Sequence, residues 1–172
     1  MLIPQIETER LRLRGFAETD LDAYAEMCGD REVMRYIGGQ PLSRAEAWRN
    51  MAMIVGHWFL LGYGLWAVEE RSSGEMIGRI GCWQPEGWPG LEVGWTLRRA
   101  YWGRGYATEA AKASIDYGFK NLEPSQIISL IDPKNLASQR VAERLGAKII
   151  KTTPLFDREV LVYAINRENW QL

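Results

Sequence analysis

The sequence has little of what zinc sites and disulfide-rich folds need. Its 172 residues include two cysteines, Cys28 and Cys82, and a single histidine, His57. They form no metal-ligand spacing, so the sequence predicts no metal site, and both thiols are expected to be buried, reduced and inert. The formal net charge of −1 supplies no basic surface, so neither nucleic acid nor an anionic membrane is an expected partner.

Long apolar runs are also missing. The most apolar stretch, MAMIVGHWFLLGYGLW, is shorter than a membrane span and is interrupted by glycines and a histidine. The N-terminal stretch MLIPQIETERLRLRGF carries acidic residues and no apolar run of the signal-peptide type. A cytoplasmic location is therefore expected. The composition, 47% apolar and 25% charged, is that of a globular protein, and the length suits one domain over residues 1–172.

The order of the predicted elements indicates the fold class. The predicted strands cover residues 6–16, 62–70, 76–83, 91–97, 126–131, 147–153 and 159–165, and the predicted helices cover residues 20–30, a segment capped by Ser43, and residues 106–121 and 136–146. Three consecutive strands favour antiparallel pairing, and the later strand–helix–strand step favours one parallel crossover. The sequence thus predicts an α/β protein with a mixed sheet.

The stretch RRAYWGRGYATEAA, residues 98–111, places Gly103 and Gly105 directly before a predicted helix. Unpaired amides and the helix dipole make such a turn an anion site, and glycine lets a ligand approach the backbone closely. No Lys-Ser/Thr pair follows Gly105, so the turn is not a P-loop. Thr108 stands where a dinucleotide motif needs its third glycine, which leaves dinucleotide binding a distant alternative.

Residues 102–107 resemble the pyrophosphate signature [QR]-x-x-G-x-[GA] of the GNAT superfamily of acyl-CoA-dependent N-acetyltransferases, with Trp102 in place of Gln or Arg. The later stretch DPKNLASQRVAERLGAK resembles another helix of that family, with Asn135 and Ser138 in an N-x-x-S spacing. The stretch EVGWTLRRAYWGRGYATEA is similar to the branch that includes ribosomal-protein N-terminal acetyltransferases. The likeness covers nearly the whole chain and implies a mostly antiparallel central sheet flanked by helices.

The resemblance implies acetyl-CoA as the cosubstrate and also implies which residues bind it. Strand backbone near Gly94 would pair with pantetheine where the strand bends from its neighbour, and the glycine turn would bind the pyrophosphate. The implied cofactor-binding residues are Trp95, Thr96, Leu97, Trp102, Gly103, Arg104, Gly105, Tyr106, Ala107, Thr108, Asn135 and Ser138. Two residues have a second interpretation, since Asn135 suits a helix N-cap and Gly94 could simply allow close packing.

The implied reaction is direct attack of a neutral amine on the thioester, with backbone N–H groups near the bend stabilising the oxyanion. Glu92 lies two residues before Gly94 on the same strand face and is the candidate base; a solvated or salt-bridged glutamate is the alternative. Many family members carry a tyrosine acid where this chain has Ala142. Ser138 is therefore the candidate acid.

Several aromatic residues, Trp83, Trp88 and Trp95, are expected near an acceptor pocket, whereas His57 is expected on a helix face and Glu109 in support of a helix start. The expected acceptor is an amine, either the N-terminal α-amine of a protein or peptide or a small-molecule amine such as a polyamine or an antibiotic. The missing tyrosine keeps open a non-catalytic acyl-CoA-binding sensor. A homodimer is compatible with the family.

Overall fold

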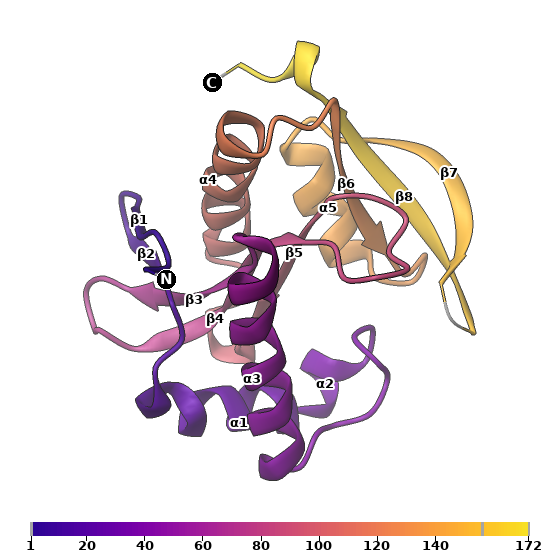
Figure 1. Ribbon diagram of the computed structural model, residues 1–172. Coiled ribbons are helices and arrows are strands. Elements are labelled where there is room, and N and C mark those ends of the chain that lie inside the picture. The colour runs from indigo at the N-terminus through magenta and orange to yellow at the C-terminus, as the bar shows by residue number, and fades with distance from the viewer. Residues whose placement is uncertain (1, 156, 172) are drawn as a thin grey trace.

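An eight-stranded sheet, with order β1-β2-β3-β4-β5-β6-β8-β7, organises the computed structural model, which describes residues 2–155 and 157–171 (Figure 1). The strands are β1 (Ile6–Glu7), β2 (Leu11–Arg14), β3 (Leu65–Glu70), β4 (Met76–Trp83), β5 (Glu92–Leu97), β6 (Gln126–Ile131), β7 (Lys148–Leu155) and β8 (Arg158–Asn166). The helices are η1 (Glu18–Asp20), α1 (Leu21–Gly29), α2 (Arg31–Met34), α3 (Arg44–Leu61), η2 (Arg99–Tyr101), α4 (Tyr106–Asn121), α5 (Leu136–Arg144) and η3 (Arg167–Asn169). Residues 1, 156 and 172 of the predicted domain lie outside the described part.

The strand pairing confirms the predicted topology. Strands β3, β4 and β5 form the antiparallel meander. Helix α4 then carries the chain to β6, which pairs parallel with β5. The other neighbouring strands pair antiparallel, so the sheet is mixed but mostly antiparallel. The N-terminal hairpin β1–β2 and the C-terminal hairpin β7–β8 lie at opposite edges (Figure 1).

The predicted strand over residues 6–16 is wrong in one respect, because the chain turns back within it. The N–H of Thr8 donates to the carbonyl of Leu11 at 2.9 Å, and the Thr8 hydroxyl accepts from the Leu11 N–H at 3.1 Å. This turn divides the segment into β1 and β2, which pair with each other. The short helix α2, capped by the side chain of Asp30, is an element that the sequence did not reveal.

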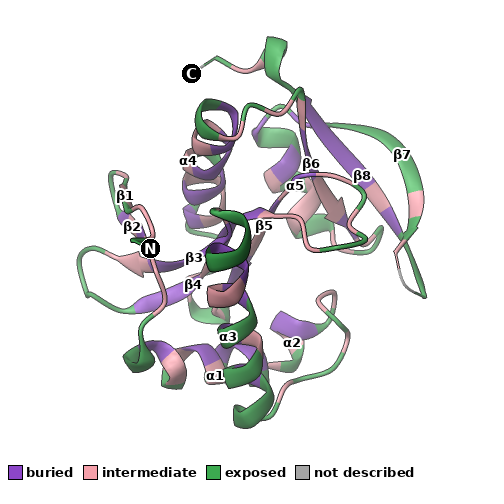
Figure 2. Ribbon diagram, viewed as in Figure 1, coloured by how far each residue is buried: buried purple, intermediate pink, exposed green. Residues whose placement is uncertain are grey.

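Two apolar clusters pack on opposite faces of the sheet, as the alternation along β3 shows. Trp66 and Val68 point into the cluster that α4 and α5 cover, whereas Leu65 and Ala67 point into the cluster under α1, α2 and α3. In Figure 2, buried residues accordingly fill the strands in the middle of the sheet, while much of α3 and β7 is exposed. Helices α4 and α5 are thereby packed on the same face of one sheet.

Both cysteines are buried free thiols, as predicted. Burial raises the pKa of the Cys82 thiol to about 12, so the reactive thiolate is scarce at neutral pH. Among the described residues, no helix combines the length and the apolar character that crossing a bilayer requires.

Candidate active site

Strands β5 and β6 diverge almost as soon as they meet. The ladder consists of one pair, Glu92 with Ile128. Beyond it, side chains replace the backbone partners: the Ser129 hydroxyl donates to the carbonyl of Val93 at 2.7 Å, and the Leu130 N–H donates to Oε1 of Glu92 at 3.2 Å. From residue 94 onward, β5 pairs with β4 but with no other strand of the described chain. We call the β6-facing side of residues 94–97 the open edge.

Backbone alternation decides which residues present polar groups to the open edge. The carbonyls of Leu91 and Val93 point toward β6, so Trp95 and Leu97 point the same way. Thr96 instead turns its backbone toward β4, where it pairs with Arg79. The Leu97 carbonyl already accepts from the indole of Trp102 at 2.9 Å. Among the three residues implied to bind pantetheine, Trp95 therefore offers both an N–H and a carbonyl.

The carboxyl group of Glu92 lies at the point of divergence. Its Oε2 accepts from the Trp88 indole at 2.7 Å, and its Oε1 accepts from Leu130. Burial of the carboxyl raises the pKa of Glu92 to about 7, although these two hydrogen bonds and the charge of Arg79 pull it down. The residue nevertheless retains partial exposure. A glutamate whose carboxyl pKa is raised toward neutral by burial suits a general base.

Gly94 lies where β5 parts from β6, but it forms no bulge there and does not serve close packing. Its register against β4 is unbroken, so it forms no bulge, and no backbone packs tightly on it. The atoms nearest to a Cβ built at Gly94 belong to the Glu92 carboxyl group, with Oε1 at 3.7 Å. The missing side chain therefore leaves one side of that carboxyl group uncovered.

The glycine turn has the geometry of an anion site at a helix start. Gly103 and Gly105 adopt φ values of +75° and +81°, in the left-handed region that glycine tolerates. Gly105 is the N-cap of α4 and brings no side chain to it. The first hydrogen bond across this end joins the Glu109 N–H to the Gly105 carbonyl at 3.1 Å. The amides of residues 106–108 come before it and point out of the helix end.

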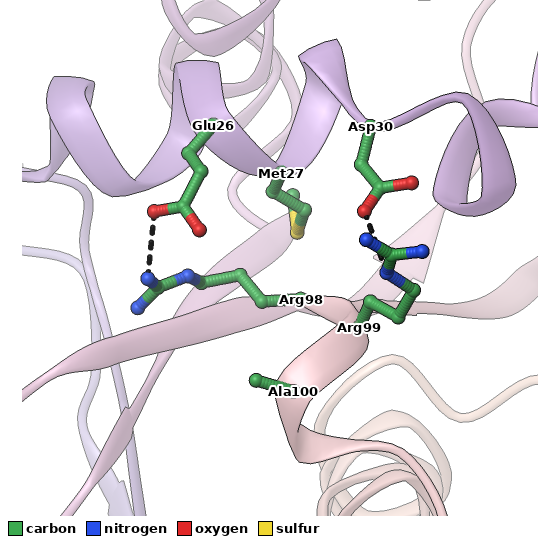
Figure 3. Close-up of a pocket in the computed structure, with 6 residues that line it drawn as sticks. All are labelled: Glu26, Met27, Asp30, Arg98, Arg99 and Ala100. Atoms are coloured by element: carbon green, nitrogen blue, oxygen red, sulfur yellow. Dashed lines mark hydrogen bonds and ion pairs between the residues drawn. The ribbon is translucent and has the colours of Figure 1, made fainter.

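The connection from β5 to this turn is held by helix α1. Arg98 pairs with Glu26 at 2.7 Å, and Arg99 pairs with Asp30 at 3.0 Å. Figure 3 shows both guanidinium groups reaching up to these carboxylates around a small hollow, about 130 Å³, that Met27 and Ala100 also line. Because each of these charged groups has a partner within the hollow, we infer that the hollow holds the turn in place and does not bind a ligand.

Helix α5 faces the open edge with its first turn. The side chain of Asn135 accepts from the Ser138 N–H at 3.2 Å, which confirms the predicted N-cap. The Ser138 hydroxyl accepts from the Trp95 indole at 3.2 Å. The structure therefore joins two residues implied to lie along pantetheine, Trp95 and Ser138, although they are far apart in the sequence.

His57 is part of the scaffold. Its Nδ1 lies 2.7 Å from the carbonyl of Tyr63, and its Nε2 accepts from the Gln84 N–H at 3.4 Å. The ring stacks on Trp83 with a centroid distance of 4.2 Å. Both ring nitrogens are thus engaged on helix α3, as expected for a helix-face histidine. Trp83 pairs with Glu92 across β4 and β5, so it lies on the face of the candidate base.

Comparison with known proteins decides the family. The family model for the acetyltransferase (GNAT) domain matches residues 10–148, which include the open edge, the glycine turn, and Asn135 and Ser138 at the start of α5. The chain belongs to the GNAT acetyltransferase family. As a GNAT protein, it is an acetyl-CoA-dependent N-acetyltransferase, and its mostly antiparallel sheet flanked by helices is the GNAT fold.

Similar proteins share this GNAT domain over nearly their whole length. The uncharacterized protein YkkB of Bacillus subtilis (strain 168) is 34% identical over 92% of this chain and 94% of its own. The uncharacterized N-acetyltransferase YnaD of the same strain is 31% identical over 96% and 98%. An acetyltransferase from Agrobacterium tumefaciens (strain C58), known from its crystal structure, superposes with a TM-score of 0.87, 34% identity and 96% coverage of both chains.

Proposed function

We propose that this GNAT enzyme transfers the acetyl group of acetyl-CoA to a primary amine, with the N-terminal α-amine of a peptide or protein as the leading acceptor. A small-molecule amine is the second candidate. The proposal rests on one juxtaposition: Glu92, the uncovered side left by Gly94 and the polar backbone of Trp95 meet where β5 and β6 diverge. A base and an oxyanion donor are thereby adjacent along one strand.

The described residues fit acetyl-CoA along this edge. The carbonyl of Trp95 and the N–H of Leu97 can pair with the pantetheine amides as a neighbouring strand would, which leaves the Trp95 N–H for the thioester oxygen. Amides of residues 103–108 would receive the pyrophosphate, and no atom lies within 4 Å of a Cβ built at Gly103, so the approach there is open. Asn135 and Ser138, at the start of α5, would flank the pantetheine arm. The remaining implied residues of the turn, Trp102 and Arg104, are both exposed.

The chemistry then needs the amine nitrogen to lose two protons and the leaving sulfur to gain one. Glu92 takes a proton from the acceptor ammonium group, and the amine nitrogen attacks the thioester carbon. The carbon–nitrogen bond forms, the Trp95 N–H stabilises the oxyanion, and the carbon–sulfur bond breaks. The Ser138 hydroxyl accepts a hydrogen bond from Trp95, so it can give its own proton to the departing thiolate, and the second proton that the nitrogen loses as the amide forms restores the hydroxyl.

The pKa of Glu92 favours an α-amine as the acceptor. Transfer of a proton from an α-ammonium group of pKa near 8 to a carboxylate of pKa about 7 is only slightly uphill. The same transfer from a lysine-like ammonium group of pKa near 10.4 is uphill by several kcal/mol. A more basic acceptor would therefore leave Glu92 a poorly matched base.

The test compares acceptors of one kind at a time. Release of the CoA thiol is followed with three kinds of acceptor. The first is a set of short peptides with a free N-terminus, and the second is a set of Nα-formylated peptides whose amine is a lysine side chain. The third is spermidine or an aminoglycoside. We expect turnover with the free α-amine peptides. Turnover restricted to spermidine or the aminoglycoside would establish the second candidate, and binding of CoA without thiol release for any amine would indicate the sensor alternative.

A further inference from the structure

The turn between β1 and β2 is fastened to helix α4. The hydroxyl of Thr8 donates to Oε1 of Glu109 at 2.6 Å, and the backbone N–H of Arg10 donates to the same oxygen at 2.9 Å. The side chain of Arg10 reaches Oε2 of Glu109 from Nε and from Nη2, each at 2.7 Å. Glu109, at the start of α4, therefore accepts the hydrogen bonds that hold the N-terminal hairpin, about a hundred residues away in sequence.

The guanidinium group of Arg10 continues from Glu109 to the glycine turn. Its Nη1 donates to the carbonyl of Arg104 at 2.9 Å. Its Cζ lies 4.5 Å from the ring centroid of Tyr106, and its Nη2 lies 3.4 Å from a Cβ built at Gly105. One side chain thus contacts residues 104 and 106 of the turn and lies beside the space that a side chain at Gly105 would occupy.

The contact with Arg104 fixes the direction of one amide in the turn. In a trans peptide the C=O and the following N–H point in opposite directions, and the described chain contains no cis peptide. Because the Arg104 carbonyl points to Arg10, the Gly105 N–H points away from Arg10. Without this contact, the peptide would be free to rotate, since glycines with positive φ stand on both sides of Arg104. A rotated peptide would turn a carbonyl toward a phosphate.

We propose that Arg10 is a positioning residue for the acyl donor: it orients the Arg104–Gly105 peptide so that the Gly105 amide can bind the pyrophosphate of acetyl-CoA, and Glu109 holds Arg10 in place. This inference rests on the proposed location of the pyrophosphate at residues 102–108. Arg10 itself acts through the backbone of the turn. Its effect is therefore confined to donors that carry a pyrophosphate.

The experiment compares two acyl donors. Acetyl-CoA contains the pyrophosphate, and S-acetylpantetheine carries the same thioester without it. Arg10→Gln and Glu109→Gln are each expected to raise the dissociation constant for acetyl-CoA about tenfold, the loss typical of a charge-assisted hydrogen bond. Both variants should keep the wild-type kcat/KM for S-acetylpantetheine. The double variant should bind acetyl-CoA little less tightly than the more impaired of the two single variants, because both substitutions act through one contact.

Two further variants make the test decisive. Arg12→Gln removes the same charge from the same hairpin, where Arg12 pairs with Glu7 and Glu69, and should leave both donors unaffected. Arg10→Lys keeps the charge but lacks the forked geometry, and should stay impaired.

Three results would overturn the inference: wild-type affinity in Arg10→Gln, full rescue by lysine, or equal losses with both donors. A wild-type enzyme that used both donors equally well would instead contradict the proposed pyrophosphate site itself.

Discussion

Substitution of Glu92 by glutamine tests the central chemical assignment. Glutamine keeps the size of the side chain and an oxygen for the Leu130 N–H, but it cannot take a proton from the acceptor. A general base contributes about 10²- to 10⁴-fold to the rate. We therefore expect kcat of Glu92→Gln to fall within that range, while the dissociation constant for acetyl-CoA stays near that of the wild type.

The pH dependence gives a second and sharper number. With a pKa of about 7, Glu92 is about 9% ionised at pH 6 and about 91% ionised at pH 8, so wild-type kcat should rise about tenfold between them. Glu92→Gln should lose this rise. The free energy of unfolding should change in the opposite direction. Because the folded protein holds the Glu92 proton more tightly than the unfolded chain does, the wild type should become less stable as the pH rises from 4.5 toward 7.

The assay is thiol release at saturating acetyl-CoA and acceptor, measured every half unit from pH 5.5 to 9, with thermal unfolding recorded in the same buffers. Glu86→Gln is the matched control, because Glu86 is exposed in the loop before β5. It should keep both the rate and its pH rise. A Glu92→Gln enzyme with the wild-type rate and the same rise in kcat would refute the base assignment.

Three other substitutions test the remainder of the site. Gly105→Glu should abolish acetyl-CoA binding in calorimetry while the chain stays folded, since a side chain at φ +81° costs about 1–2 kcal/mol; unchanged affinity would rule out the turn as the pyrophosphate site. Gly94→Ala should keep or slightly raise the melting temperature yet lower kcat/KM for the acceptor, because its methyl group lies against the Glu92 carboxyl group; full activity would show that the acceptor approaches elsewhere. Ser138→Ala should lower kcat about two- to tenfold, the range of one lost hydrogen bond, and a larger loss would give Ser138 a greater part in the chemistry.

Local signals in the sequence were enough for most of the fold. Helix α4 and strand β6 have the predicted bounds, and Ser43 caps α3 together with Glu46 as a capping box. These features depend on residues close together in the chain, where cap chemistry and apolar periodicity act. The turn at Thr8 was missed although the apolar pattern changes phase across it, from Ile6 at an even position to Leu11 and Leu13 at odd positions.

The residues of the candidate site could be proposed from the sequence, but their hydrogen-bond partners could not. The glycine turn and the cap at Asn135 carry their own signatures. The hydrogen bonds that tie Glu92 to Leu130 and Glu109 to Arg10 join distant segments, and no spacing in the sequence marks them. The position of Gly94 beside the Glu92 carboxyl group could not be predicted either, because it depends on the rotamer of the Glu92 side chain.

The divergence of β5 from β6 also bears on self-association. An unpaired strand edge is a template for foreign strands and therefore an aggregation hazard. Here the unpaired segment of β5 is interior to the sheet order, between β4 and β6, and the Ser129 hydroxyl and the Glu92 carboxylate close the end where the two strands meet. Because β6 flanks this segment in the same sheet, it is not an outer edge along which the sheet of a second molecule would extend. The proposed pantetheine site would thus recognise a small ligand as a strand would, without the aggregation hazard of an outer strand edge.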